Sequence, residues 1–248
     1  MITFAAKTDV GKERKINQDY YLASLERPYL FVLCDGMGGH QSGDVASSTA
    51  AKSIETYVRM QNTFDLDEEK AEKLLKNAVS YANNVVHTRA QAGAGLLGMG
   101  TTADVCLLDF DKLYIVHVGD SRVYLLRQGT LTRLTTDHSL VGEMVEKGMI
   151  TEEEAENHPK KNIITRAVGT NSKVEIDFIT KDLLQDDIIL MCSDGLSNLV
   201  PEQELKHLLI SAADPEAVVE NLVNQANANG GKDNITALYI KKNTKEEA

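Results

Sequence analysis

The chain has 248 residues, 42% of them hydrophobic, which is enough apolar material for the core of one large domain. Its formal net charge of −11 argues against nucleic acid as a main partner, because phosphate backbones are bound by clustered lysine and arginine. The charged residues Lys7 and Asp9 interrupt any secretion signal, and no apolar stretch reaches membrane-spanning length. We therefore expect one cytoplasmic domain, residues 1–248, that does not bind membranes.

The three cysteines, Cys34, Cys106 and Cys192, each lie inside an apolar run. Their odd number and wide spacing do not suit a disulfide framework. We expect reduced, buried thiols, which are usual in a cytoplasmic protein.

The N-terminal third predicts two strands followed by two long helices. Short apolar runs bounded by turn residues indicate strands at Ile2 to Ala6 and Tyr29 to Cys34. Apolar residues then recur at helical spacing from Gly43 to about Gln61 and from about Asp65 to Gln91. Each helix therefore has one apolar face that can cover a sheet.

The middle of the chain predicts a meander and then a surface segment. The runs Ala103 to Leu108, Leu113 to Val118 and Val123 to Arg127 follow one another, with "DFDK" and "RQGT" as turns, which indicates antiparallel hairpins. From Asp137 to Gly169 the chain has two short helical patterns and little apolar material. We interpret this segment as a flap, about residues 137–166, inserted between core strands.

The C-terminal third predicts strands at Val174 to Ile179, Ile188 to Cys192 and Ile235 to Ile240. Helices are expected from Pro201 and from Pro215, because proline is favoured in the first turn of a helix. Strands that follow one another as hairpins, with helices before and after them, favour an α+β fold. We expect two stacked antiparallel sheets covered by helices.

Four aspartates stand at strand ends. Asp35, Asp120 and Asp194 each follow an apolar run, and Asp233 comes just before one. Neighbouring carboxylates repel one another when buried, so a cluster of them implies bound cations. An oxygen-only set of ligands suits Mg²⁺ or Mn²⁺ rather than zinc. An Asp-Gly pair after a strand is also an ordinary turn signal, so only the group of aspartates favours a metal site.

Six motifs occur in an order that is typical of one family. They are "RKINQD" (Arg14 to Asp19), "DGMGGHQSGDVAS" (Asp35 to Ser47), "GMGTT" (Gly98 to Thr102), "VGDSRVY" (Val118 to Tyr124), "SDGL" (Ser193 to Leu196) and "KDNIT" (Lys232 to Thr236). Over essentially its whole length the sequence resembles the protein phosphatase 2C family, the metal-dependent Ser/Thr protein phosphatases, in its small bacterial form. The resemblance implies a four-layer αββα sandwich with a flap.

The resemblance also implies a centre of two Mn²⁺ or Mg²⁺ ions. Asp35 would bridge both ions, the Gly36 carbonyl would hold one, and Asp194 and Asp233 would hold the other. In bacterial members Asp120, together with Asp194, would form a third, weaker site.

Other residues follow from the same resemblance. Asp19 would act through a metal-bound water, and Arg14 would grip the phosphate with its planar fork of donors. A metal-bridging hydroxide would then attack phosphorus. Met37 stands where some members have a histidine proposed as general acid, and His40 is the candidate to replace it. Gln18 replaces a glutamate of many eukaryotic members, so one ion should depend more on water.

Several rival interpretations start from single motifs. "GAGLLG" (Gly93 to Gly98) matches a dinucleotide fingerprint, but it follows a predicted helix and precedes a predicted strand, the reverse of the required order. "DFDKL" (Asp109 to Leu113) resembles an aspartyl-phosphate motif, yet its place between strands indicates a hairpin. No cysteine has an arginine six residues later, which disfavours a cysteine phosphatase.

The predicted function is therefore Mn²⁺- or Mg²⁺-dependent hydrolysis of phosphoserine and phosphothreonine in proteins. The implied partners are phosphorylated proteins and the Ser/Thr protein kinase that such an enzyme opposes in signal transduction. Two alternatives stay open: a catalytically weak module that binds phosphoproteins, and a phosphatase dedicated to one regulatory partner.

Overall fold

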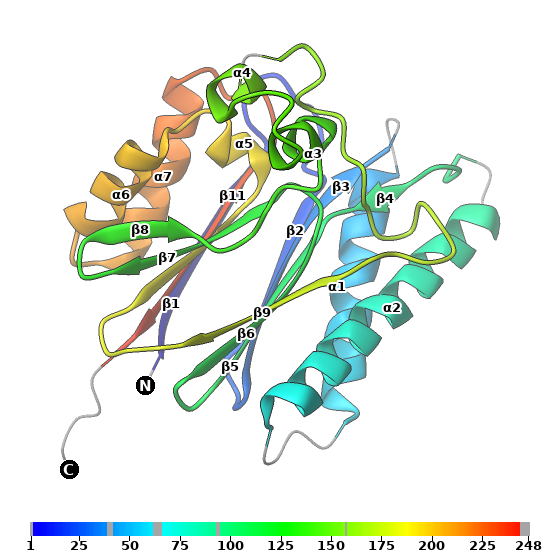
Figure 1. Cartoon of the computed structure of the whole chain (residues 1–248), viewed down its shortest axis with the longest axis horizontal. Helices are drawn as coiled ribbons and strands as arrows, with labels where there is room; N and C mark the ends of the chain where they lie inside the picture. The colour runs from blue at the N-terminus through cyan, green and yellow to red at the C-terminus, as the bar shows by residue number, and fades with distance from the viewer. Residues whose placement is uncertain (1, 39–41, 62–65, 93–94, 157, 244–248) are drawn as a thin grey trace.

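Two antiparallel sheets lie face to face at the centre of the computed structural model (Figure 1). The structure describes all residues except 1, 39–41, 62–65, 93–94, 157 and 244–248. Helices cover the outer face of each sheet, and two short helices lie at one end. The predicted α+β fold, a four-layer αββα sandwich with a flap, is confirmed.

The first sheet joins the two ends of the chain. Its strand order is β1 (Ile2–Asp9), β11 (Ile235–Lys242), β10 (Ile188–Cys192), β7 (Arg122–Arg127) and β8 (Thr130–Arg133). β1 pairs with β11 along its full length, from Ile2 opposite Lys242 to Asp9 opposite Ile235. The start of β11 is therefore fixed beside the end of β1.

The second sheet has the order β2 (Asp19–Ser24), β3 (Tyr29–Met37), β5 (Ala103–Asp109), β6 (Lys112–Val118) and β9 (Asp177–Asp182). The short strand β4 (Gly100–Thr101) pairs with the end of β3. All of these pairs are antiparallel. In this sheet Asp19 stands directly opposite Asp35.

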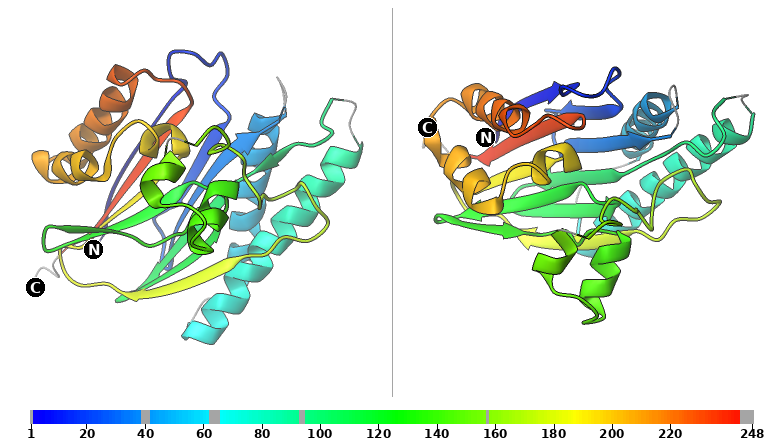
Figure 2. Two further views of the ribbon diagram at one scale, coloured as in Figure 1. Left: turned by 45° about the horizontal axis from the view of Figure 1, so that its top comes forward. Right: turned by 90° about the horizontal axis from the view of Figure 1, so that it is seen from above.

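The helices form the outer layers. α1 (Gly43–Arg59) and α2 (Glu68–Ala92) cover the second sheet, whereas α6 (Glu202–Ser211) and α7 (Pro215–Ala228) cover the first (Figure 1). α5 (Asp194–Ser197) is a single turn directly after β10. The flap contains α3 (Leu140–Glu146) and α4 (Glu152–Glu156), which project beside one end of the sandwich in both views of Figure 2.

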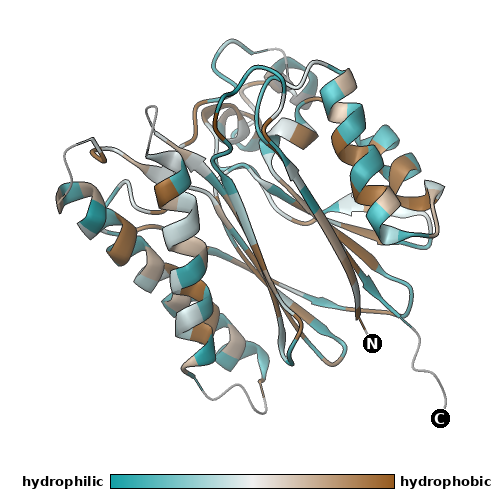
Figure 3. Cartoon of the chain, turned by 180° about the vertical axis from the view of Figure 1, so that it is seen from behind, coloured by the Kyte–Doolittle hydropathy of each residue, from teal (hydrophilic) through white to brown (hydrophobic). Residues whose placement is uncertain are grey.

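Three apolar clusters hold these layers together. One packs α1 and α2 against the second sheet, one packs α5, α6 and α7 against the first, and one fills the space between the sheets. In Figure 3 apolar residues run along the strands and alternate with polar ones along the helices. Burial of this apolar surface is the main favourable contribution to folding.

The two predicted hairpins are confirmed. β5 and β6 turn through Phe110, and β7 and β8 turn through Gln128, each with a positive φ of 49°. This left-handed backbone is typical of tight hairpin turns. The "DFDKL" motif is therefore a turn between paired strands. "GAGLLG" lies between α2 and β4, and Gly93 and Ala94 are outside the described residues.

Three strands, β2, β4 and β8, were not predicted, and the position of a fourth is shifted; β4 has only two residues. β2 and the edge strand β8 have mostly half-buried or exposed residues, so neither shows a continuous apolar run. The predicted strand Val174 to Ile179 is β9, displaced to Asp177–Asp182. Val174 and Ile176 pack against the apolar cluster under α2 before the chain pairs with β6. The apolar residues of this segment are therefore explained by packing under α2 and not by strand pairing.

The three cysteines are free and buried, as expected. Within the described part of the chain, no helix is both long enough and apolar enough to cross a membrane.

Candidate active site

Five aspartates from separate elements interact at one end of the sandwich. Asp19 begins β2, Asp35 lies near the end of β3, and Asp120 lies in the turn between β6 and β7. Asp194 begins α5, and Asp233 lies two residues before β11. The charges of the other four all act on Asp35, so the predicted carboxylate cluster is present.

Burial and mutual repulsion disfavour the charged forms of these carboxylates. Removal from water, followed by the neighbouring carboxylates, raises the pKa of Asp35 and of Asp194 well above the usual range. Burial raises the pKa of Asp19 and that of Asp120 to about 6. The cluster therefore binds positive charge favourably, either as protons or as cations.

Two buried carboxylate oxygens support the cation alternative. Asp19 Oδ2 accepts hydrogen bonds from Ser193 Oγ (2.7 Å) and Thr236 Oγ1 (2.6 Å), which fix the orientation of this carboxylate. Asp19 Oδ1 and Asp120 Oδ1 are buried and have no hydrogen-bond partner among the described residues. A buried acceptor without a partner is costly, and a cation would satisfy it.

The chemistry of the donors suits a hard cation. The cluster offers carboxylate oxygens and nearby backbone carbonyls, which are the ligands that Mg²⁺ and Mn²⁺ prefer. Among the side chains that the structure describes, no three His, Cys, Asp or Glu residues form a ready-made metal site. The residues present nevertheless fit such ions in type, charge and burial.

The backbone of Asp35 is held by two threonines of the "GMGTT" motif. Asp35 N donates to Thr102 Oγ1 (2.9 Å), while Thr101 Oγ1 and Thr102 N both donate to Asp35 O (2.9 and 2.8 Å). All of the atoms involved belong to two adjacent segments of the second sheet. The Asp35 side chain is thus aimed by rigid backbone contacts, as a binding site requires.

Glycines allow two close backbone approaches in the cluster. A Cβ on Gly36 would lie 2.0 Å from the carbonyl oxygen of Gly43, at the start of α1. A Cβ on Gly195 would lie 2.0 Å from the carbonyl oxygen of Asn234, next to Asp233. No larger residue fits at either position without moving a segment that carries a candidate ligand.

Arg14 lies at the edge of the cluster. Its Nη2 donates to Asp233 Oδ2 (2.7 Å), and both side chains are partly exposed. The loop that carries Arg14 is pinned by Asn234, whose side-chain amide donates to Val10 O (2.9 Å) and Ile16 O (3.0 Å). The structure therefore brings the predicted phosphate-binding arginine to the carboxylates.

The departures from the family pattern lie close by. The Gln18 carbonyl accepts a hydrogen bond from Gly36 N (3.1 Å), which joins the start of β2 to the end of β3. Met37 is the last residue of β3 and is half-buried. His40, the candidate general acid, lies outside the described residues.

Sequence reasoning overlooked the residues that support the cluster. Ser193, Thr236 and Asn234 orient Asp19 and the loop of Arg14, and Thr101 and Thr102 hold Asp35. All five lie inside the recognised motifs "SDGL", "KDNIT" and "GMGTT", which was the available signal. Their roles depend on contacts between residues as far as 224 positions apart in the chain.

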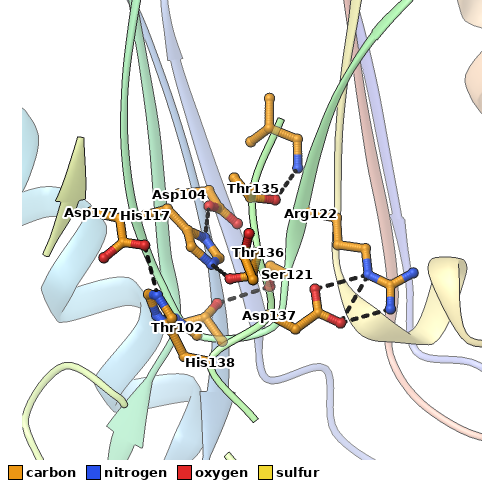
Figure 4. A network of polar contacts seen from close by, with 12 residues as sticks. Thr102, Asp104, His117, Ser121, Arg122, Thr135, Thr136, Asp137, His138 and Asp177 are labelled. Atoms are coloured by element: carbon orange, nitrogen blue, oxygen red, sulfur yellow. Dashed lines mark hydrogen bonds and ion pairs between the residues drawn. The ribbon is translucent and has the colours of Figure 1, made fainter. Parts of the chain in front are cut away.

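A second buried polar network, drawn in Figure 4, is joined to the cluster through Thr102, which binds both Ser121 and the backbone of Asp35. His117 Nδ1 lies 2.6 Å from Asp104 Oδ1, and His117 Nε2 lies 2.9 Å from the Thr136 carbonyl oxygen. The Thr136 carbonyl can only accept, and Asp104 accepts in its ionised form, so with Asp104 ionised His117 donates from both nitrogens and is protonated. Burial lowers the pKa of His117, but the Asp104 carboxylate outweighs it and raises this pKa overall.

Arg122 and Asp137 complete that network. Arg122 Nε and Nη2 donate to the two oxygens of Asp137 at 3.0 and 2.7 Å, which is a bidentate pair. Arg122 begins β7 in the first sheet, whereas His117 belongs to β6 in the second. The segment between β8 and α3 is therefore bound to both sheets.

Comparisons with known proteins show which proteins this chain is similar to. Residues 10–146 match the family model described as protein phosphatase 2C. A serine/threonine phosphatase, stp, from Listeria welshimeri is 38% identical over 239 residues, covering 96% of this chain and 94% of that protein.

Solved structures agree with the sequence comparison. The serine/threonine phosphatase Stp1 from Staphylococcus aureus superposes with a TM-score of 0.92 at 35% identity, covering 98% of this chain and 96% of that one. The catalytic domain of the phosphatase PstP, in complex with 2 manganese ions, superposes with a TM-score of 0.85 at 33% identity, covering 97% of each chain. The chain therefore belongs to the protein phosphatase 2C family, and the predicted enzyme class, a protein phosphatase, is confirmed.

Proposed function

We propose that this protein hydrolyses phosphoserine and phosphothreonine in other proteins, with two Mn²⁺ or Mg²⁺ ions as cofactors. The observation that carries the proposal is the cluster of five aspartates, two of which have a buried oxygen without a hydrogen-bond partner among the residues that the structure describes. The relatives named serine/threonine phosphatases support the substrate class, and the manganese ions bound to PstP support the cofactor.

Four residues would hold the two ions. Asp35 lies centrally in the cluster and would bridge them, with the Gly36 carbonyl on one ion and Asp194 and Asp233 on the other. Bound divalent cations of this kind lower the pKa of coordinated water, which supplies a nucleophile near neutral pH. Asp19, fixed by Ser193 and Thr236, would hold a water at the edge of the site.

Two further residues extend the site. The charge of Asp120 raises the pKa of Asp194, which means that the two carboxylates repel each other. A third ion held by both would neutralise this repulsion. Arg14 contacts Asp233 through only one of its nitrogens, Nη2. Its other donors can therefore orient a phosphate in the cluster, as the planar guanidinium does in anion sites. His40 stays the candidate general acid.

The biological setting follows from the activity. We propose that the whole chain acts as one cytoplasmic domain, with residues 137–166 as its flap. Its substrates would be phosphorylated Ser/Thr proteins, and it would oppose a Ser/Thr protein kinase.

Phosphate release from a phosphothreonine peptide tests the proposal. We expect activity with Mn²⁺ or Mg²⁺, none with EDTA, and a loss of more than about 100-fold in Asp35→Ala and Asp233→Asn. His207→Ala, on the exposed side of α6, is the matched control and should keep wild-type activity. A wild-type protein that binds the peptide but releases no phosphate with either ion would instead be a phosphoprotein-binding module.

A further inference from the structure

The flap leaves the sandwich through a short segment, residues 136–138, that we call the flap root (Figure 4). The Thr136 carbonyl is bound by His117, and the Asp137 carboxylate is bound by Arg122. The third residue, His138, is 6% exposed and points toward the turn that carries Asp120.

His138 binds both backbone polar groups of Gly119. The His138 N–H donates to the Gly119 carbonyl (2.7 Å), and the Gly119 N–H donates to His138 Nδ1 (3.1 Å). Gly119 directly precedes Asp120. One residue of the flap root thus sets the peptide groups on the N-terminal side of a candidate metal ligand.

Gly119 has little freedom to adopt another position. Its φ is +119°, which favours glycine, and a Cβ there would lie 2.5 Å from Thr102 Cγ2. On the other side of Asp120, Ser121 Oγ lies 2.9 Å from Thr102 Oγ1. The two chain neighbours of Asp120, Gly119 and Ser121, therefore both lie against Thr102. Thr102 also binds the backbone of Asp35.

Among the described residues, the Asp120 carboxylate takes its hydrogen-bond support from its own backbone N–H. It is 9% exposed, and its Oδ1 is buried without a hydrogen-bond partner in the described part of the chain. The direction of this side chain consequently depends on the backbone of Gly119 and Ser121, and hence on the residue that holds Gly119.

The other side of the His138 ring connects to the far end of the flap. Because Nδ1 accepts from Gly119, Nε2 carries the hydrogen and donates to Asp177 Oδ2 (3.1 Å), while Arg166 Nη1 lies 3.1 Å from the same nitrogen. Arg166, where the flap ends, donates from Nη1 to the other oxygen of Asp177 (2.9 Å). The ring of His117 packs on that of His138, with centroids 4.5 Å apart. Both ends of the flap thus meet at this imidazole.

We propose that His138 is a positioning residue that aims the Asp120 carboxylate through the Gly119 peptide groups and couples the seating of the flap to cation binding at Asp120. This inference rests on the proposed function, in which Asp120 holds an ion. His138 touches neither substrate nor cation; it acts through Gly119 alone.

Two substitutions separate this role from general support of the fold. Asn in place of His138 retains an acceptor near the Nδ1 position and can still bind the Gly119 N–H. Gln places its amide near the Nε2 position, so its side chain retains the contact with Asp177 but not the one with the Gly119 N–H. The backbone bond to the Gly119 carbonyl persists in every variant. The inference therefore predicts that His138→Asn preserves the Asp120 site and His138→Gln does not.

Mn²⁺ binding to metal-free protein, followed by electron paramagnetic resonance, is the direct measurement. We expect the weakest binding step to become about tenfold weaker in His138→Gln and in His138→Ala, the effect typical of losing a residue that orients a ligand. It should stay near the wild-type value in His138→Asn and in the control His207→Ala. In parallel, the same pattern should appear in the Mn²⁺ concentration needed for half-maximal phosphate release.

Several results would overturn the inference. Equal weakening in the Asn and Gln variants, together with equal loss of thermal stability, would show a purely structural role. An unchanged Mn²⁺ affinity in His138→Gln would exclude coupling through Gly119. If His138→Ala does not fold, the Asn and Gln pair decides the question alone.

The variant Asp120→Asn shows whether a negative result concerns the positioning role of His138 or cation binding at Asp120 itself. If this variant loses the weakest Mn²⁺ step while the His138 variants keep it, only the positioning role is wrong. If Asp120→Asn keeps every Mn²⁺ step, Asp120 holds no ion, and both the third site and the inference are wrong.

Discussion

Two polar regions lie side by side in this protein and handle buried charge in opposite ways. In the aspartate cluster, like charges face one another, and oxygens of Asp19 and Asp120 lack partners among the described residues. In the neighbouring network, charges of opposite sign are matched: His117 with Asp104, and Arg122 with Asp137. The first region leaves its negative charges uncompensated by the described residues, whereas the second pairs each carboxylate with a cationic side chain, although Asp104 Oδ2 is buried without a hydrogen-bond partner in the described part of the chain.

The difference shows how a site of high charge can be kept in a stable fold. Carboxylates crowded for cation binding destabilise a metal-free protein, because burial and repulsion oppose their ionisation. The network beside them fixes the turn of Asp120 and the flap root from both sheets. Substitutions in the two regions should therefore have opposite effects on stability.

The largest effect is expected from removing one partner of the fully buried pair. His117→Ala leaves Asp104 buried without its partner, so the free energy of unfolding should fall by about 3–5 kcal/mol. Urea denaturation followed by circular dichroism measures this change. The double substitution Asp104→Leu with His117→Leu should cost clearly less. If His117→Ala were as stable as the wild type, the proposed contrast between the two regions would be wrong.

The opposite sign is expected in the cluster. Asp35→Asn removes the carboxylate that is repelled by the other four, so the metal-free protein should gain about 1–2 kcal/mol in free energy of unfolding. The same variant should lose Mn²⁺ binding and activity. Denaturation in EDTA measures the gain in stability, and denaturation in excess Mn²⁺ measures the loss of cation binding. A metal-free variant less stable than the wild type would argue against repulsion among the carboxylates.

The metal-free protein should also lose stability as the pH rises. Burial raises the pKa of Asp19 and of Asp120 from 3.8 to about 6, so the folded state binds more protons than the unfolded state. Their contribution is therefore present below about pH 4 and is lost as the pH rises through about 6. Calorimetry at about pH 5 and about pH 8, in EDTA, should give the lower Tm at the higher pH.

Cations should reverse this pH trend. Mn²⁺ binds the ionised carboxylates, so the gain in Tm on adding it should be larger at the higher pH. A gain that does not depend on pH would indicate that the cation binds outside the cluster.

The smallest effect on stability is expected at Arg14. Its contact with Asp233 is half-exposed, with 51% and 36% of the two side chains accessible, so Arg14→Ala should change the free energy of unfolding by less than about 1 kcal/mol. Activity should fall much more than stability, because the variant loses the proposed phosphate-binding group. Arg14→Lys should recover only part of it. Comparable losses in both measurements would assign Arg14 to the fold instead.

The sequence by itself determined much of the secondary structure and the identity of the candidate ligands. Apolar runs marked β3, β5, β6 and β10 because strands buried on both faces need continuous apolar sequence. Each of Asp35, Asp120 and Asp194 follows such a run, so the chain order alone indicated carboxylates at strand ends. The six motifs then identified the family.

Only the tertiary structure decided which residues support those ligands. β2 and β8 were missed because half-buried strands carry a weak apolar signal, and their pairing comes from neighbours distant in the chain. The hydrogen bonds from Ser193 and Thr236 to Asp19, and from Gly119 to His138, join segments that no local pattern relates. Local sequence specifies the residue types, whereas packing of the two sheets fixes which side chains meet.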